Sequence, residues 1–383
     1  MARVLIAVDK WKGTLSAVEV STAIARELGG QADVCPLADG GEGFIAAMQM
    51  ACREMSWTSR YSRVCGPLAD EPSVEAEWGM FVAAGGSKTA VIEMAQAAGL
   101  WRVPESRRLP RLKPLEATTF GVGQLLLQAV EAGADRIILG IGGSATVDAG
   151  LGCCQAVGHT ILMKEGETID AADPLRAIDL ERVLMIKRGR GSVLDRVPIV
   201  VGCDVTNPLC GIAGAAAVFG PQKGATQEEV DWLNQQHAEL ARRSFAMDAA
   251  DTPGAGAAGG LGFAMLAFFN AQLVSGFDLI AEAVGLQGRV AAADVVITGE
   301  GRLDEQSLMG KTVGRVAGIA KRAGKRCVVM CGECSLTESQ WRAAGVTEVL
   351  AVVPTLATDV EHSKAMGAMA VERLVTSWSC VQR

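Results

Sequence analysis

Short apolar runs rich in valine and isoleucine recur along the chain, and each ends near a glycine or an aspartate. This pattern predicts buried parallel strands at Val4–Val8, Val34–Leu37, Arg136–Leu139, Asp294–Thr298, Cys327–Cys331 and Glu348–Val353. Helical patterns follow most of these runs. Ser16 and Glu19 form a capping box before one of them, Gly29 and Gly30 end it, and residues 313–322 repeat the pattern. The alternation predicts a doubly wound α/β domain with a parallel sheet.

A different pattern fills the intervening segments. Residues 73–80 alternate between apolar and polar side chains, which predicts a half-exposed strand and an antiparallel or mixed sheet over residues 56–114. Residues 160–290 lack the strand–helix rhythm apart from Val197–Gly202, and they hold a helix capped by Thr226 and Glu229. We therefore expect a first domain of residues 1–55, 115–159 and 291–383. A second, mixed-sheet domain of residues 56–114 and 160–290 is inserted into it.

Polar or glycine-rich loops follow four of the predicted strands, at residues 9–12, 39–42, 140–148 and 299–304. Open α/β sheets bind ligands beyond the carboxyl ends of their strands, so these loops are expected at a ligand-binding edge. Glycine loops at helix starts offer backbone N–H groups that suit phosphate. Side chains that phosphoryl transfer with Mg²⁺ requires stand beside them. These are the carboxylates Asp39, Glu42, Asp204, Glu300 and Asp304 and the cations Lys12, Lys223, Lys311 and Arg302.

Three glycine patterns resemble nucleotide-binding motifs without completing them. Gly140-Ile-Gly-Gly-Ser-Ala145 follows a strand, but the second strand with an acidic end that an NAD site needs is missing. The spacing recurs at residues 254–259 with no preceding strand. At Gly310-Lys311-Thr312, Glu305 stands where a P-loop needs glycine. The patterns disfavour standard NAD and P-loop sites and leave a general phosphate-binding role open.

Composition narrows the class of partner. Of the 383 residues 49 % are hydrophobic and 21 % charged, which excludes a disordered chain. The formal net charge of −7, with no basic block, argues against a nucleic-acid partner. Eleven cysteines without a secretory leader predict free thiols in a reducing cytoplasm, including Cys331 and Cys334. The charge-free segment 252–277 has a purely apolar part of only Leu261–Phe269, which predicts a buried helix and no membrane span.

Several of these segments, taken together, resemble the glycerate kinase family of the glycerate 2-kinase type. They are Asp9-Lys-Trp-Lys-Gly-Thr-Leu-Ser-Ala17, Ala38-Asp-Gly-Gly-Glu-Gly43, Ile92-Glu-Met-Ala95, Ala117-Thr-Thr-Phe-Gly-Val-Gly123, Gly140-Ile-Gly-Gly-Ser-Ala-Thr146, Cys203-Asp-Val-Thr-Asn-Pro-Leu209, Phe219-Gly-Pro-Gln-Lys-Gly224, Pro253-Gly-Ala-Gly-Ala-Ala-Gly-Gly260 and Ile297-Thr-Gly-Glu-Gly301 with Asp304. The resemblance implies ATP-dependent phosphorylation of D-glycerate at the 2-hydroxyl group, with Mg²⁺. It also implies a Rossmann-like sheet with an inserted α/β domain and an active site in the cleft between them. Val147 and Ala149 depart from the family pattern, which often has asparagine and glycine there.

The roles of individual residues are hypotheses within that resemblance. Catalysis is assigned to Asp204, Lys12 and Asp304, with Asp204 as the base that accepts the hydroxyl proton. Glycerate is expected at Asp9, Asp39, Arg302 and Lys311, with Lys12 or Arg302 meeting its carboxylate. The nucleotide is expected at Gly142, Gly143, Ser144, Gly254, Gly256 and Gly259, and Mg²⁺ at Glu300, Asp304 and Asp204.

Other functions stay open at the level of sequence. A shift of the substrate by one carbon would direct phosphorylation to the 3-hydroxyl group without altering any motif. An NAD-dependent hydroxy-acid dehydrogenase would use residues 140–145, and a sensor would bind glycerate without catalysis. We expect a cytoplasmic monomer or homodimer that binds small molecules and neither nucleic acid nor membrane.

Overall fold

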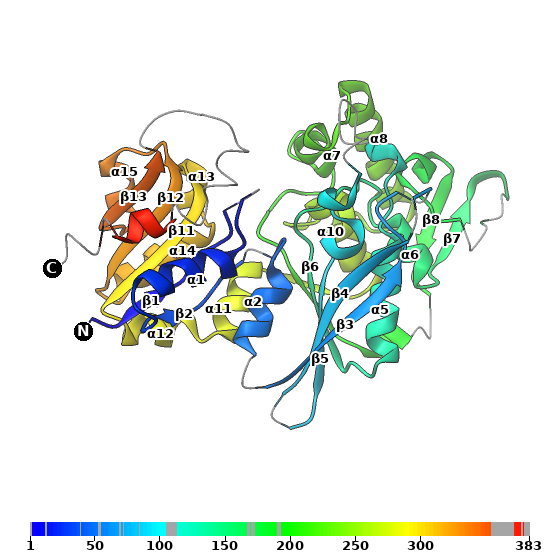
Figure 1. The fold of residues 1–383 in the computed structure, drawn as a ribbon. Helices are drawn as coiled ribbons and strands as arrows, with labels where there is room; N and C mark the ends of the chain where they lie inside the picture. The colour runs from blue at the N-terminus through cyan, green and yellow to red at the C-terminus, as the bar shows by residue number, and fades with distance from the viewer. Residues whose placement is uncertain are drawn as a thin grey trace. The chain divides into compact units, whose positions relative to one another are not determined.

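The protein divides into two compact units, which we describe separately (Figure 1). The computed structural model describes residues 2–11, 14–38, 40–52, 55–68, 70–71, 73–83, 85–104, 113–166, 169, 173–189, 193–353, 371–376 and 378. Unit 1 comprises residues 1–39, 46–54 and 277–383, and unit 2 comprises residues 40–45 and 55–276.

Unit 1 is built on a five-stranded parallel sheet in the order β13–β12–β11–β1–β2. Its strands are β1 (Val4–Ile6), β2 (Asp33–Val34), β11 (Val295–Leu303), β12 (Arg326–Cys334) and β13 (Glu348–Val353). At its centre Val4 pairs with Val295, which pairs in turn with Arg326. Five of the six predicted parallel strands belong to this sheet.

Helices cover the sheet of unit 1, and their ends follow local sequence signals. They are α1 (Ala17–Glu27), α2 (Phe44–Ala51), α11 (Gly276–Ala283), α12 (Leu286–Ala292), α13 (Glu305–Leu308), α14 (Thr312–Arg322) and α15 (Glu338–Ala343). The predicted capping box of Ser16 and Glu19 starts α1, and α14 begins one residue before the predicted start. Val20 and Ile24 of α1 are fully buried in one apolar cluster with Ile297 of β11.

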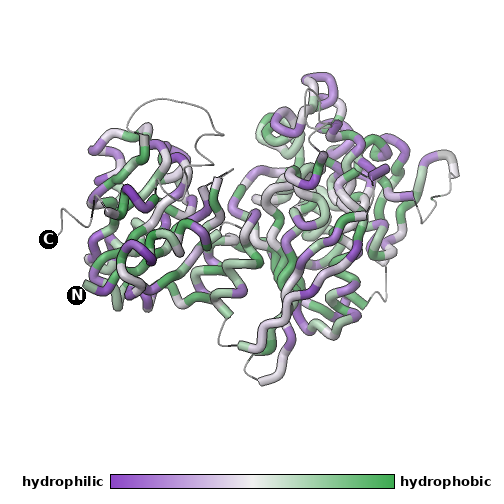
Figure 2. The backbone as a smooth tube through the Cα atoms, viewed as in Figure 1, coloured by the Kyte–Doolittle hydropathy of each residue, from purple (hydrophilic) through white to green (hydrophobic). Residues whose placement is uncertain are grey.

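Unit 2 holds a six-stranded mixed sheet in the order β10–β9–β6–β5–β4–β3. Its strands are β3 (Ser56–Val64), β4 (Val74–Val82), β5 (Lys88–Glu93), β6 (Arg136–Gly140), β9 (Ile199–Gly202) and β10 (Gln272–Val274), beside a separate pair of β7 (Thr160–Met163) and β8 (Val183–Lys187). The β3–β4–β5 portion is antiparallel, and β5, β6, β9 and β10 are parallel. The predicted half-exposed strand is β4, along which hydropathy varies between neighbouring positions (Figure 2). Its burial alternates over residues 74–78 as predicted, but residues 78–81 are all buried, so the second half of the strand is not half-exposed.

The helices of unit 2 surround this sheet. They are α3 (Ala95–Ala98), α5 (Phe120–Glu131), α6 (Leu151–Ala156), α7 (Ala215–Phe219), α8 (Gln227–Arg243), α9 (Met247–Asp251) and α10 (Ala257–Phe268). Thr226 and Glu229 cap α8 as predicted. Part of the charge-free segment forms the buried helix α10, which confirms that prediction. The helix is kinked near its start, where Ala258, Gly259 and Gly260 have left-handed backbone angles. Every helix in the described part of the chain is too short or too polar to span a lipid bilayer.

The expected domain boundaries need correction at three segments, the shortest of which is residues 40–45, which lie in unit 2. Residues 115–159 lie in unit 2, because β6 pairs with β5 and β9 and so belongs to the mixed sheet. Residues 277–290 lie in unit 1, where Arg289 of α12 forms an ion pair with Asp33 of β2. The strand signal of β6 is the same as that of the unit 1 strands, so periodicity alone could not separate the two sheets.

Ten of the eleven cysteines fall within the described residues, and all ten are free thiols. Cys331 and Cys334 lie at the end of β12 without a disulfide between them. Burial raises the pKa of Cys331, which disfavours the thiolate that metal binding requires. The structure therefore agrees with thiols in this pair.

Candidate active site

Asp9 lies just beyond β1, at the carboxyl edge of the unit 1 sheet. Its backbone N–H donates to the carbonyl oxygen of Gly299 at 3.0 Å, which places it beside the middle of β11, next to Glu300. The hydroxyl of Thr312, the first residue of α14, donates to Asp9 Oδ2 at 2.7 Å, and the N–H of Lys10 donates to Oδ1 at 2.7 Å. The carboxylate of Asp9 is thus held from both of its oxygens.

Glu300 lies near the carboxyl end of β11, two residues after Thr298. Burial, helped by nearby Asp9 and Asp304, raises the pKa of Glu300 to about 7, although a hydrogen bond from Ser307 and the charge of Lys311 act in the opposite direction. Its Oε1 atom and the Oγ1 atom of Thr298 are enclosed without a hydrogen-bond partner among the described residues. Buried polar atoms are nearly always paired, so these two atoms mark a place where a ligand can complete the hydrogen bonding.

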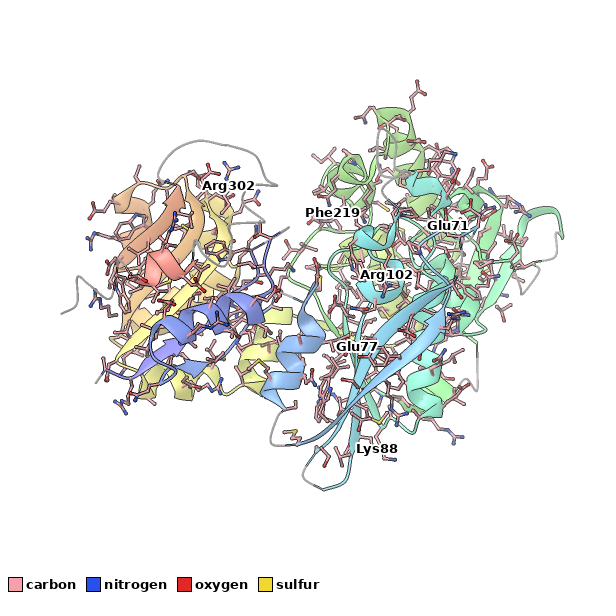
Figure 3. All side chains as sticks on the ribbon, in the orientation of Figure 1. Glu71, Glu77, Lys88, Arg102, Phe219 and Arg302 are labelled. Atoms are coloured by element: carbon pink, nitrogen blue, oxygen red, sulfur yellow. The ribbon has the colours of Figure 1, made fainter. Side chains whose placement is uncertain are left out.

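Asp304 begins α13 and uses its carboxylate as the helix cap. Its Oδ1 accepts from the N–H of Ser307 at 3.1 Å and from the Ser307 hydroxyl at 3.3 Å. Lys311 is exposed, with Nζ 3.5 Å from Gln306 Oε1. Arg302 is exposed at the surface of unit 1, with Nε 4.0 Å from Glu333 Oε2 (Figure 3). Unit 1 therefore gathers Asp9, Glu300 and Asp304 with a lysine at one edge of its sheet.

Two of the predicted substrate-site residues, Lys12 and Asp39, lie outside the described residues. Asp204, the expected base, belongs to unit 2 and lies in the loop after β9. The hydroxyl of Ser275, which follows the neighbouring strand β10, donates to Asp204 Oδ1 at 2.7 Å. The carboxylate is exposed to solvent, so it remains accessible to a substrate.

The loop after β6 carries Gly142, Gly143 and Ser144 and is fixed by backbone hydrogen bonds. The N–H of Gly142 donates to Gly40 O at 3.1 Å, and the carbonyl of Gly143 accepts from Leu100 N at 2.9 Å. A Cβ at Gly142 would come within 2.4 Å of the Cα atom of Gly41, so only glycine allows the two backbones to cross. Gly143 has a φ of 76°, in the left-handed region.

The second glycine segment, at the start of α10, packs against this loop. A Cβ at Gly259 would lie 2.0 Å from Thr146 O, and one at Gly256 would lie 2.3 Å from Pro208 O. Gly254 has a φ of 92°, which also favours glycine. Close packing of the protein's own backbone thus accounts for Gly256 and Gly259, and the positive φ accounts for Gly254. Nucleotide binding by these three glycines stays a prediction.

The comparisons with known proteins agree with one another over nearly the whole chain. A profile of the glycerate kinase family matches residues 4–379. The chain belongs to the glycerate kinase family. It is 40 % identical to glycerate 2-kinase of Escherichia coli strain K12, over 93 % of this chain and 92 % of that protein. It is 37 % identical to glycerate kinase of Halalkalibacterium halodurans, over 99 % of each.

The fold supports the same family. A crystal structure of a candidate glycerate kinase 2 from Salmonella typhimurium LT2 aligns with a TM-score of 0.77 and 38 % identity, covering 100 % of this chain and 99 % of that one. As a member of the glycerate kinase family, the chain is an α/β enzyme that takes ATP as phosphate donor and a small molecule as acceptor.

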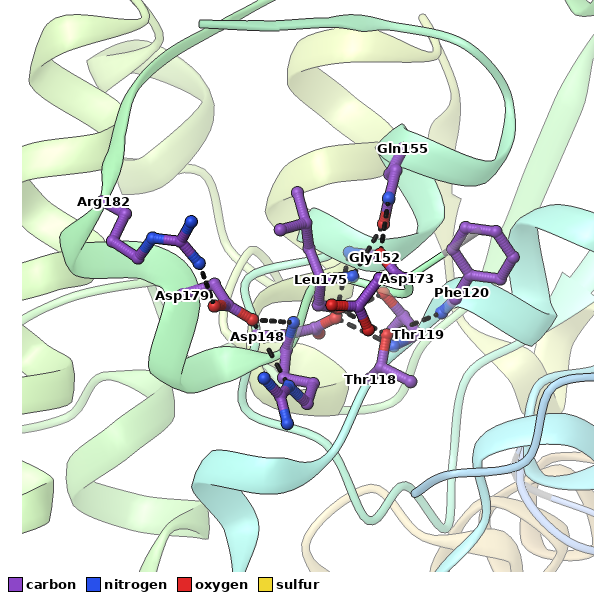
Figure 4. A network of polar contacts seen from close by, with 11 residues as sticks. Thr118, Thr119, Phe120, Asp148, Gly152, Gln155, Asp173, Leu175, Asp179 and Arg182 are labelled. Carbon is purple, nitrogen blue, oxygen red and sulfur yellow. Dashed lines mark hydrogen bonds and ion pairs between the residues drawn. The ribbon is translucent and has the colours of Figure 1, made fainter. Parts of the chain in front are cut away.

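The two departures from the family pattern flank a buried carboxylate. Ala149 adopts a φ of 51°, in the left-handed region where the family's glycine carries no steric cost. Val147 offers its carbonyl oxygen to the His237 ring, with Nε2 at 2.9 Å. Between them, fully buried Asp148 accepts from the N–H and the hydroxyl of Thr119, at 2.8 and 2.7 Å, and from the amide of Gly152 at 3.2 Å (Figure 4). Burial raises the pKa of Asp148 against these hydrogen bonds.

Lys223 and Asp148 are the residues to which sequence reasoning gave no specific role. Lys223 was one of several cations expected near phosphate or carboxylate oxygens, yet its Nζ is buried against the loop that carries Ser144. The signal available for Lys223 was its place in the motif Phe219-Gly-Pro-Gln-Lys-Gly224. That motif marks the position without saying that the lysine faces inward.

Mg²⁺ in phosphoryl-transfer sites is held by one or two carboxylates together with substrate phosphates. Within the described ranges, no three or more His, Cys, Asp or Glu side chains are grouped so as to hold a metal ion by themselves. Glu300 could be one of the one or two protein ligands of such an ion, because its Oε1 atom lacks a hydrogen-bond partner among those residues. Oδ1 of Asp304 accepts from Ser307 and Oδ1 of Asp204 accepts from Ser275, whereas Oε1 of Glu300 is buried without a partner among those residues and is therefore the oxygen best suited to the ion.

Proposed function

We propose that the protein transfers the γ-phosphoryl group of ATP to the 2-hydroxyl group of D-glycerate. Similarity to glycerate 2-kinase of E. coli, 40 % identical over 93 % of this chain, is the observation that supports this acceptor and this position most directly. The reaction breaks the bond between the γ-phosphorus and the oxygen of ADP, and forms a bond from the 2-hydroxyl oxygen to that phosphorus. The hydroxyl proton leaves to a carboxylate.

Asp204 is our candidate for the group that takes this proton. Its Oδ1 is oriented by the hydroxyl of Ser275 at 2.7 Å, and the side chain is open to solvent. A carboxylate within hydrogen-bond reach of the attacking hydroxyl can act as a general base. Asp304 is assigned to the same chemistry with less geometric support, since it caps α13.

Glycerate binding is assigned to Asp9, Asp39, Arg302 and Lys311, with Lys12 or Arg302 as the partner of the substrate carboxylate. The fixed orientation of Asp9 supports a role in holding a substrate hydroxyl group. The ATP phosphates are assigned to the loops that carry Gly142, Gly143, Ser144, Gly254, Gly256 and Gly259. We assign Mg²⁺ to Glu300, with Asp304 and Asp204 as further candidates; the ion neutralises charge on the transferred phosphoryl group.

Phosphorus NMR of the product made from D-glycerate, ATP and Mg²⁺ tests the activity and its position together. We expect the resonance of 2-phospho-D-glycerate and release of ADP. A 3-phosphoglycerate resonance would contradict the position but not the acceptor, and unchanged ATP would contradict the activity. Assembly as a monomer or homodimer in the cytoplasm remains part of the proposal, and sedimentation velocity tests its oligomeric state.

A further inference from the structure

Lys223 is a buried lysine whose ammonium group faces the loop after β6. It ends the short 3₁₀ helix Pro221–Lys223 between α7 and α8, and only 3 % of its surface is exposed. Its Nζ atom lies 2.7 Å from Ser144 Oγ and 2.7 Å from the carbonyl oxygen of Thr146. A segment nearly eighty residues further along the chain therefore holds the loop from inside the unit.

The direction of these hydrogen bonds follows from the chemistry of the groups. In its ammonium form Lys223 has three donors and no acceptor, so it donates to both Ser144 Oγ and Thr146 O. The Ser144 Oγ atom therefore acts as the acceptor toward Lys223, and its own proton is left to point elsewhere. No acceptor for that proton occurs among the residues described, and Ser144 keeps 9 % of its surface exposed.

The backbone on either side of Ser144 is held in place independently of Lys223. Leu100 N donates to Gly143 O at 2.9 Å, and Ala145 N donates to Ala98 O at 2.9 Å. Ser144 thus sits between two fixed neighbours, and Lys223 determines which way its hydroxyl group can donate. Burial lowers the pKa of Lys223 to about 7, although the nearby Asp148 acts in the opposite direction. Burial also lowers the pKa of His237 to about 4, so its ring is neutral near pH 7.

We propose that Lys223 is a positioning residue that acts through Ser144, directing the serine hydroxyl proton toward an anionic oxygen of a bound substrate. That oxygen belongs to a nucleotide phosphate or to the glycerate carboxylate. The inference rests on the proposed function, because it takes these two molecules as the ligands. The serine hydroxyl group then serves as a hydrogen-bond donor of the loop after β6, in addition to the backbone N–H groups of that loop.

The test compares Ser144→Ala, Ser144→Thr, Lys223→Met and the double variant Ser144→Ala/Lys223→Met with the native chain. KM for ATP, KM for D-glycerate, kcat and the thermal unfolding midpoint are measured for each. Lys187→Met is the matched control, because Lys187 is an exposed lysine of the same unit at the end of β8. The control is expected to leave all four quantities unchanged.

We expect Ser144→Ala and Lys223→Met to raise KM for the same substrate by about tenfold or more, as loss of a hydrogen bond to a charged group does. A rise in KM for ATP identifies a phosphate as the oxygen, and a rise in KM for glycerate identifies the carboxylate. Ser144→Thr retains the hydroxyl group and should stay within about threefold of the native KM. In the Ser144→Ala background, Lys223→Met should raise KM little further, because the serine hydroxyl group through which Lys223 acts is absent.

Three results would overturn the inference: a change below about threefold in both KM values for folded Ser144→Ala, an equal loss with Ser144→Thr, or additive effects in the double variant. A purely structural lysine would lower the unfolding midpoint and the active fraction without raising KM. If Lys223→Met does not fold, the two serine variants decide the question by themselves.

The two proposals can fail separately. If the native chain does not phosphorylate glycerate, calorimetric titration of native protein and Ser144→Ala with ADP and with D-glycerate replaces the kinetics. Weaker binding of one ligand by Ser144→Ala then supports the positioning role. Equal binding, or no binding of either ligand to the native chain, overturns it.

Discussion

The hydroxyl group of Thr312 donates a hydrogen bond to Asp9 Oδ2 at 2.7 Å, across 303 residues of the chain. It joins the first residue of α14 to the segment after β1 and orients Asp9 beside the middle of β11. The position of the Asp9 carboxylate therefore depends on the docking of α14, and not on its own strand alone.

Asp9→Asn should lower kcat/KM for glycerate by about 100-fold or more, because the amide removes the negative charge and one acceptor from the site. Thr312→Val should lower kcat/KM by about tenfold, since the Asp9 carboxylate remains but loses the hydroxyl donor that orients it. Steady-state kinetics with varied glycerate measure both. Thr347→Val is the matched control: it removes a hydroxyl hydrogen bond of the same length, to Cys327 O at 2.7 Å, before β13 in the same unit. Equal losses in Thr312→Val and Thr347→Val would contradict a local role for Thr312.

Glu300→Gln should lower kcat by about 100-fold while leaving the protein folded, because the amide has the same shape but cannot offer a charged oxygen. Glu338→Gln in α15 of the same unit is the control, since that side chain is 66 % exposed and pairs with Arg342. The rate of phosphoryl transfer in a single turnover at saturating ATP is measured for both variants. Similar rates for both variants would exclude Glu300 from the site.

Asp204→Asn should reduce kcat by at least about tenfold with little change in KM, because general-base catalysis acts in the transition state. Ser275→Ala should give a smaller loss in the same direction, since it removes only the orienting hydroxyl. Asp231→Asn serves as control: this carboxylate of α8 accepts one hydrogen bond, from Gln227, at 2.9 Å. A native kcat in folded Asp204→Asn would rule out the proposed base.

Gly259→Ala should destabilise the protein severely, by more than about 4 kcal/mol, because its Cβ would lie 2.0 Å from Thr146 O at a φ of 66°. Gly288→Ala provides the opposite case. Gly288 lies inside α12 with nothing within 4 Å of an added Cβ, so alanine there should stabilise by about 0.5–1 kcal/mol. Thermal unfolding midpoints check both, and a Gly259→Ala protein as stable as native would show that the loops can separate.

Unit 2 should lose stability in acid through His237. Burial lowers the pKa of His237 to about 4, below its usual value of 6.5. The unfolded chain therefore binds a proton between these pH values while the folded chain does not. The contribution of neutral His237 to the free energy of unfolding is present above pH 6.5. It is lost as the pH falls toward 4, by up to about 1.4 kcal/mol for each pH unit. His237→Gln should flatten this dependence in urea unfolding from pH 7 to pH 4, and parallel curves for both proteins would contradict it.

Local signals predicted the elements of this fold well, because their causes lie within a few residues. The capping boxes at Ser16 and Thr226 and the apolar runs of β1, β11 and β12 form as expected. Assigning strands to sheets failed at β6, since pairing depends on partners far along the chain.

The candidate site shows the same difference between local signals, which the sequence reveals, and contacts between distant residues, which it does not. Asp9, Glu300 and Asp304 were placed together from the rule that ligands bind beyond strand ends, and unit 1 brings them to one edge. The glycines at 254–259 were interpreted as ligand contacts, and the structure gives Gly256 and Gly259 a further reason to be glycine, because both lie against the protein's own backbone. Nothing near Lys223 in the sequence shows that it faces inward, because the contact with Ser144 spans 79 residues.

The pairing of β1 with β11 has a consequence for how the chain acquires its structure during synthesis. Val4 pairs with Val295, so the N-terminal strand leaves the ribosome long before its partner exists. Most of unit 2, residues 55–276, is complete by then and can fold first, since domains fold as units. The sheet of unit 1 closes last, through contacts of very high sequence separation, which form slowly. Until then β1 exposes an unpaired apolar edge, and it is during this interval that a nascent chain depends most on protection from aggregation.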